Sequence, residues 1–169
     1  QSAQSASSAF PSSSRPTILY SNKNFMAQFT FTKSERLKSA KTIARLFKEG
    51  QSFGVFPLRL VWLKVEEAKS DAPVQFSLTV PKKAFKTAVA RNRLRRKIRE
   101  AWRLNKHRLY RKMEAQGGGR QLACMVIYTA KEDLPFAQIE QAMQVVISKF
   151  SKKIAAPNAN LVPPNASPS

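Results

Sequence analysis

The sequence predicts an α+β fold in which helices pack on one small mixed sheet. Its 169 residues are 43% hydrophobic, which is enough for a single core of ordinary size. Segments whose apolar residues alternate with period two are separated by segments with the 3.6-residue period of a helix. They follow one another as helix, strand, strand, helix, strand, helix. This order predicts an α-β-β-α-β-α sandwich in which a helix crosses one face of the sheet.

The chain divides into a central domain, residues 31–154, and two extensions. Residues 1–30 are rich in Ser, Ala and Gln, and residues 155–169 are rich in Pro. Such segments contain too little apolar surface to offset the entropy of ordering, so both are expected to be disordered. The first has no apolar stretch typical of a secretory signal. Met26 is a candidate start of the core protein.

Residues 34–49 predict the first helix, because their apolar side chains recur with a helical period. The face expected to point inward consists of Ala40, Ile43, Ala44 and Phe47. Ser39 is a candidate N-cap, and Gly50 supplies a stop at the other end. Residues 32–35 also match a capping box, which leaves the start of the helix open by one turn.

Two half-buried strands are expected over residues 53–66 and 75–80, because apolar and polar residues alternate in both. Pro57 indicates an edge position or a break in the first strand. Trp62 is expected to be a core residue. A polar turn separates the two strands, so the simplest arrangement is an antiparallel hairpin.

The second helix is expected over residues 88–112, with a candidate break near Asn105. On a helical wheel one side is apolar and is expected to dock on the core. That side consists of Leu94, Ile98, Ala101 and Trp102. The opposite side carries Asn92, Arg95, Arg96, Arg99 and Arg103. Like charges four residues apart destabilise an isolated helix, so a role in solubility alone is a poor explanation for this pattern.

A third strand is expected over residues 121–128, buried on both faces because its apolar run is nearly continuous. A flexible connection, residues 116–119, precedes it. The last helix is expected over residues 135–151, and Pro135 suits its first turn. Its inward side is expected to consist of Phe136, Ile139, Met143, Val146, Ile147 and Phe150.

The net charge of +20 indicates a polyanionic partner. Residues 82–112 hold fourteen Lys and Arg against one acid, Glu100. A single basic block of this kind is typical of nucleic-acid binders. No apolar run approaches the roughly 20 residues that a membrane-spanning helix needs, and the basic helix lacks the bulky apolar face of an interfacial one. We therefore expect a nucleic-acid partner and no membrane.

Catalytic and metal-binding residues are not expected in this chain. One cysteine and one histidine cannot form a Cys/His metal cluster, and Cys124 lies in an apolar run where a small buried hydrophobe is expected. His107 lies among basic residues and is expected at the surface. The close carboxylate pairs, Glu66/Glu67 and Glu132/Asp133, fall in predicted turns, whereas a two-metal nuclease needs several inward carboxylates.

A family resemblance is carried by three features of residues 36–153. The pair Arg36-Leu37 precedes the first helix, and Phe47 with Gly50 marks its end. The third and most specific feature is the string FSLTVPKKAFKTAVARNRLRRKIREAW, in which a strand and paired lysines lead into Arg-Asn-Arg and further arginines. Together they resemble the protein subunit of bacterial ribonuclease P. Phe85 stands where that family usually has Gly, and Ile43 where it often has an aromatic residue.

The resemblance implies a ribosomal protein S5 domain 2-like fold with a left-handed βαβ crossover, against the usual right-handed rule. It also implies that the protein is not itself the catalyst. In this family the RNA subunit, with Mg²⁺ bound mainly by that RNA, hydrolyses the phosphodiester that joins the 5′ leader to precursor tRNA. The implied protein is a bacterial cytoplasmic one, and one copy is expected per RNA subunit.

Two sets of binding residues are expected from the resemblance. The set expected to bind the RNA subunit consists of Lys82, Lys83, Lys86, Arg91, Asn92, Arg93, Arg95, Arg96, Arg99 and Arg103. The set expected to bind the single-stranded leader, in a cleft between the first helix and the sheet, consists of Arg36, Ile43, Phe47, Ser77 and Thr79. Core packing of Phe47 is an open alternative.

Two other functions fit the charge pattern. One is a general RNA-binding or ribosome-associated structural protein with no role in tRNA processing. The other is a DNA-binding protein that reads the major groove with the arginine-rich helix. No short helix and turn precede that helix, which argues against a helix-turn-helix.

Overall fold

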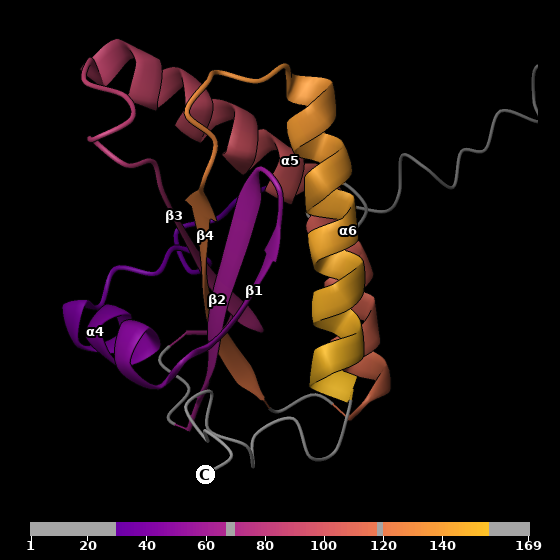
Figure 1. The fold of residues 1–169 in the computed structure, drawn as a ribbon. Coiled ribbons are helices and arrows are strands. Elements are labelled where there is room, and N and C mark those ends of the chain that lie inside the picture. Colours follow the sequence, from indigo (N-terminus) through magenta and orange to yellow (C-terminus); the bar gives the residue numbers. More distant parts are fainter. Residues whose placement is uncertain (1–29, 67–69, 118–119, 156–169) are drawn as a thin grey trace, which may run out of the picture. The chain divides into compact units, whose positions relative to one another are not determined.

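The computed structural model describes residues 30–66, 70–117 and 120–155, and Figure 1 shows the arrangement of their helices and strands. These ranges contain four strands and three helices, so the predicted α+β class is confirmed with one strand more than expected. In chain order the elements are α4 (Ala40–Glu49), β1 (Gln51–Val55), β2 (Leu58–Val65), β3 (Val74–Thr79), α5 (Ala88–Ala115), β4 (Gln121–Tyr128) and α6 (Phe136–Ala155). Met26 and nearly all of the two expected disordered extensions lie outside the described residues.

The strand predicted over residues 53–66 is wrong as a single element, because the chain reverses at a cis Phe56–Pro57 peptide bond. The antiparallel β1–β2 hairpin begins immediately beside that bond, where Val55 pairs with Leu58. Pro57 therefore marks a break between two strands, one of the two roles predicted for it. The break is tied to the neighbouring strand, since the Pro57 carbonyl accepts the N–H of Thr129 (2.8 Å).

The four strands form one sheet in the order β1-β2-β4-β3. The predicted hairpin of residues 53–66 with 75–80 is wrong, because β2 pairs with β1 and β4, and β3 lies beyond β4. β3 and β4 are parallel and are connected through α5, as the sequence predicted for the strands on either side of the basic helix. The central position belongs to β4, whose nearly continuous apolar run is buried on both faces as predicted.

The larger core lies on the face of the sheet that α5 and α6 cover (Figure 1). Phe76 of β3 stacks on Trp102 of α5 with ring centroids 4.3 Å apart, and Trp62 of β2 packs against Phe150 of α6 at 5.3 Å. The predicted core role of Trp62 is confirmed. α5 runs without a break through Asn105, whose amide donates to the Ala101 carbonyl (2.8 Å), so the candidate break is wrong.

The smaller core lies on the opposite face of the sheet, under α4. α4 begins at Ala40 with Ser39 as its N-cap, so the later of the two predicted starts is correct. Its predicted inward face is wrong. The residues that are buried are Thr42 and Leu46, whereas Ala40, Ala44 and Phe47 are exposed and Ile43 is half-buried. Leu46 packs with Leu37, Val61, Ala123 and Met125, and this large residue sets the rotation of the helix.

Gly50 provides a test of this packing, because a side chain there has no room. A Cβ at residue 50 would collide with the Leu46 carbonyl and lie 3.1 Å from the Trp62 carbonyl oxygen, whereas a Cβ at Gly54 would meet nothing within 4 Å. We expect Gly50→Ala to lower the free energy of unfolding by about 1–3 kcal/mol. The matched Gly54→Ala change should stay within about 0.5 kcal/mol of wild type. Urea denaturation of both variants measures the difference, and equal stabilities would contradict the close approach of α4 to β2.

Candidate nucleic-acid interface

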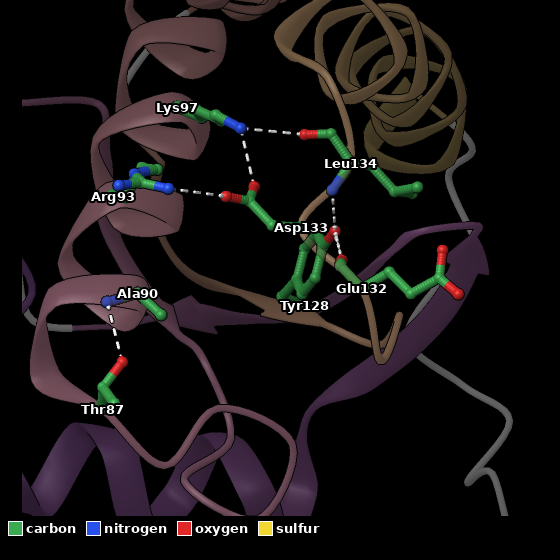
Figure 2. Close-up of polar contacts among 8 residues, drawn as sticks. All are labelled: Thr87, Ala90, Arg93, Lys97, Tyr128, Glu132, Asp133 and Leu134. Atoms are coloured by element: carbon green, nitrogen blue, oxygen red, sulfur yellow. Dashed lines mark hydrogen bonds and ion pairs between the residues drawn. The ribbon is translucent and has the colours of Figure 1, made fainter.

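The arginine-rich face belongs to α5, which is fixed to the sheet along its apolar side. The helix begins with an N-cap in which the Thr87 hydroxyl accepts the N–H of Ala90 (3.3 Å; Figure 2). All four residues predicted to dock have no exposed surface, namely Leu94, Ile98, Ala101 and Trp102. The predicted docking face is therefore confirmed, and the opposite side is left to face outward.

The outward side of α5 carries a row of arginines. Arg93, Arg96 and Arg99 are exposed, as is Asn92 on the same side, and Arg91, Arg95 and Arg103 are half-buried. Among the described residues, Arg95, Arg96 and Arg99 take part in no ion pair. Their guanidinium groups are therefore available to meet phosphate oxygens of an external ligand.

Other cations of the same segment are engaged inside the protein, so a count of charges along the sequence overstates what the surface presents. Arg103 donates to Glu100, and this hydrogen bond holds the pKa of the Glu100 carboxyl below its usual value. Lys97 pairs with Asp133, with 2.6 Å between Nζ and Oδ1. Lys106 pairs with Glu35.

The Lys106–Glu35 pair is buried, and it attaches the segment before α4 to α5. The Lys106 side chain is 2% exposed and that of Glu35 6%. Tyr110 also donates to Glu35 Oε1 (2.7 Å), and burial, with the nearby carboxylate, raises the pKa of this tyrosine. On its other side the segment follows the edge of β3, because Glu35 O accepts the Phe76 N–H (2.6 Å) and the Leu37 N–H donates to Phe76 O (3.0 Å). Residues 35–37 are therefore held between β3 and α5.

A hollow of about 370 Å³ lies where this segment, β3 and α5 meet. Arg36 and Lys38 line it from the segment, Ser77 from β3, and Arg95 and Arg99 from α5. Four of its lining residues are cationic and none is acidic. The structure thus brings members of both predicted sets together, Arg36 and Ser77 from the leader set and Arg95 and Arg99 from the RNA-subunit set.

Ser77 and Thr79 lie on the face of the sheet that carries α4. Their partners in the parallel register are Met125 and Ile127 of β4, and paired residues of neighbouring strands share a face. α4 packs on β2 and β4, so β3 beyond them stays partly exposed on this face. The small polar side chains predicted as the floor of a cleft are therefore accessible beside α4.

Ile43 and Phe47 lie one turn apart on α4 and differ in burial. Ile43 is half-buried against the smaller core, whereas the Phe47 side chain is exposed, with 58% of its surface accessible. The alternative of core packing for Phe47 is wrong. An exposed aromatic ring is suited to stack on a nucleobase.

The loop between β3 and α5 carries the exposed Lys82, Lys83 and Lys86. Arg91 stabilises this loop, since its Nη1 donates to the carbonyls of Phe85 (2.8 Å) and Lys86 (2.7 Å). Phe85 itself is buried and packs against Tyr128, with centroids 5.7 Å apart. The bulky residue at this position is therefore an anchor of the loop.

Within the described ranges no three residues among His, Cys, Asp and Glu gather closely enough to hold a metal ion. Burial, together with the charges of Arg111 and Arg108, lowers the pKa of the half-buried His107. Cys124 is buried, and burial raises the pKa of its thiol. In the part of the chain that the structure describes, no helix has both the length and the apolar character needed to cross a membrane.

Comparison with known proteins decides the family. The family model described as Ribonuclease P matches residues 31–151. This chain belongs to the ribonuclease P protein family. A ribonuclease P protein component of Porphyromonas gingivalis (strain ATCC 33277) is 40% identical over 129 residues, which cover 76% of this chain and 91% of that protein. A protein component of ribonuclease P is a subunit of a tRNA-processing endoribonuclease, and its partner is the ribonuclease P RNA.

Solved structures show the same fold. The RNase P protein of Staphylococcus aureus matches with a TM-score of 0.53 at 21% identity, covering 70% of this chain and 96% of that one. The RNase P protein of Thermotoga maritima matches with a TM-score of 0.53 at 22% identity, covering 68% of this chain and 96% of the other. These likenesses support the predicted fold class.

Sequence reasoning missed the residues that act between elements. Glu35, Lys106 and Tyr110 were not predicted to meet, and neither was Asp133 with Lys97. The helical wheel gave a signal for Asn105, which falls about 20° from Leu94, but none for Lys106, which falls about 120° from Leu94 among the arginines of the cationic side.

The buried pair yields a stability prediction. Lys106→Met leaves the Glu35 carboxylate buried without its cation, which should cost about 3–5 kcal/mol of unfolding free energy. Glu35→Gln alone should also destabilise, because it leaves the Lys106 ammonium buried. The double variant removes both charges and should recover most of the loss. A double-mutant cycle by chemical denaturation measures the coupling, and additive single effects would show that the two side chains do not interact.

Proposed function

We propose that this chain binds the ribonuclease P RNA through the cationic side of α5 and holds the 5′ leader of precursor tRNA on the partly exposed sheet face of β3. The observation that carries the proposal is the row of Arg95, Arg96 and Arg99 on a helix fixed to the core. A fixed row of guanidinium groups suits the fixed phosphate spacing of a folded RNA, and each contact adds affinity by releasing counterions. One protein is proposed to bind one RNA subunit, in the bacterial cytoplasm.

The leader is proposed to run beside α4. Ser77 and Thr79 offer a polar floor that accepts any base, Arg36 contributes charge at the edge of β3, and Phe47 offers an exposed ring. Such a surface favours an extended single strand through stacking and backbone charge, without reading a particular base. Ile43 lies one turn before Phe47 on the same side of α4 and is half-buried.

Hydrolysis is proposed to be carried out by the RNA subunit, with Mg²⁺ held mainly by that RNA. The side chains proposed to contact RNA are chiefly cationic, hydroxyl-bearing or aromatic, which suits them to bind phosphates and bases. The role proposed for the protein is therefore to bind the two RNAs and to lower the Mg²⁺ concentration that cleavage requires, by supplying cations that neutralise phosphate repulsion.

Reconstitution tests this function. The purified protein with a bacterial ribonuclease P RNA should cleave precursor tRNA at Mg²⁺ concentrations where that RNA alone is slow, and the protein without RNA should not cleave. Cleavage rates at graded Mg²⁺ concentrations are the measurement.

Arg96→Ala should weaken binding to the RNA subunit and reduce the log–log salt slope by roughly 0.7–0.9, the contribution of one phosphate contact.

The matched control is Lys149→Ala, which removes one exposed positive charge from α6. It should leave the salt slope unchanged. A general RNA-binding protein would bind the same RNAs without stimulating cleavage, and that result would overturn the proposed function.

Phe47→Ala tests the proposed path of the leader. Because the ring is exposed, its removal should change the unfolding free energy by less than about 0.5 kcal/mol. Binding of precursor tRNA to the holoenzyme should weaken by roughly 1–3 kcal/mol, the value of one base–aromatic stack, while binding of mature tRNA stays constant. Equal losses for both tRNAs would place the leader elsewhere.

A further inference from the structure

Asp133 is an acidic residue outside α5 that forms ion pairs with two cations of that helix. It lies between β4 and α6, and its two carboxylate oxygens face two different cations of α5 (Figure 2). Oδ1 is 2.6 Å from Lys97 Nζ, and Oδ2 is 3.8 Å from Arg93 Nη1. The Asp133 side chain is 28% exposed and that of Arg93 is 65% exposed, so the pair is open to an incoming RNA.

The carboxylate is held in place by the protein. Lys97 Nζ also donates to the Leu134 carbonyl (3.0 Å), and the Leu134 N–H donates to the hydroxyl of Tyr128 (3.2 Å). That hydroxyl donates in turn to the Glu132 carbonyl, as Figure 2 shows. Tyr128 is fully buried at the end of β4. Asp133 is therefore a fixed negative charge beside Arg93, and an approaching phosphate has to displace it or avoid it.

We propose that Asp133 is a specificity-determining residue that keeps Arg93 and Lys97 from binding unrelated RNA. This inference rests on the proposed function, because it concerns the same cationic side of α5. A flexible single strand gains affinity from every cation that it can reach. Asp133 pairs with Arg93 and Lys97, so these two cations are less available to such a strand, and its negative charge repels nearby phosphates. A folded RNA whose phosphates contact Arg95, Arg96 and Arg99 loses little affinity through the presence of Asp133.

Selectivity of this kind comes from a repulsive element as well as from attractive ones. Asp133 also orients the two side chains it binds. When it is removed, Lys97 and Arg93 become available to any polyanion but lose their fixed direction. The gain in binding affinity should therefore be large for an unrelated single strand and small for the folded ribonuclease P RNA.

Asp133→Asn tests the proposal, with Glu132→Gln as its matched control. Glu132 is the neighbouring residue, its carboxylate forms no ion pair within the described residues, and both substitutions add one positive charge to the net total. The probes are a bacterial ribonuclease P RNA and a polyuridine strand, each bound to the full-length protein over a series of salt concentrations. Thermal unfolding of each variant shows whether the fold is retained.

Asp133→Asn should tighten polyuridine binding about 3- to 10-fold at low salt and steepen its salt slope by roughly 0.7–1.4, as expected for one or two added contacts. Affinity for the ribonuclease P RNA should change by less than about 2-fold, so the ratio of the two affinities falls. Glu132→Gln should preserve that ratio. Asp133→Glu, which keeps a carboxylate within reach, should retain most of the wild-type ratio.

Equal effects of Asp133→Asn and Glu132→Gln on both RNAs would overturn the inference and leave the proposed function standing. Loss of discrimination in Asp133→Glu, with the fold retained, would also overturn it. A wild-type protein that binds polyuridine as tightly as ribonuclease P RNA would overturn the proposed function and the specificity role together.

Discussion

The stack of Trp102 on Phe76 fixes the arginine helix to the sheet, and the cationic surface depends on that attachment. The rings are 4.3 Å apart and nearly parallel, at 10°. Each like-charge pair four residues apart in α5 costs a few tenths of a kcal/mol, whereas burying one large apolar side chain contributes about 1.5–3 kcal/mol. Four large apolar residues of the helix are fully buried, namely Leu94, Ile98, Trp102 and Leu109. Docking therefore outweighs repulsion, and a helix that would be weak alone displays its arginines rigidly.

The protein also adjusts how much of its charge is displayed. Lys106 is neutralised inside the fold by Glu35, Lys97 is paired at the surface with Asp133, and Arg103 is bound to Glu100. Arg95, Arg96 and Arg99, which take part in no ion pair within the described part of the chain, lie together on the first half of α5. A basic block that looks uniform in the sequence is thus divided into cations that hold elements together and cations that face outward.

The sequence predicted elements whose large apolar residues recur with one clear period. The docking side of α5 and the buried strand β4 are of this kind, and their residues were identified correctly. The face of α4 was not, because small alanines completed a false helical stripe while the single large residue Leu46 set the rotation. Strand order was also missed, since neighbours in sequence were assumed to pair. The Glu35–Lys106 contact joins residues 71 positions apart, and no local pattern encodes it.

The sequence predicted one set of residues that bind the RNA subunit and another that binds the leader, and the fold brings members of both sets together. Arg36 and Ser77 share one hollow with Arg95 and Arg99, because residues 35–37 are held between β3 and α5. Opposite charges about 4 Å apart near a protein surface interact by roughly 4 kcal/mol before desolvation, so a phosphate in that hollow is attracted by the segment and by the helix at once. The contacts that position residues 35–37 therefore also affect the electrostatic potential beside α5. Glu35, though buried and remote from solvent, therefore influences the binding surface through the position of Arg36.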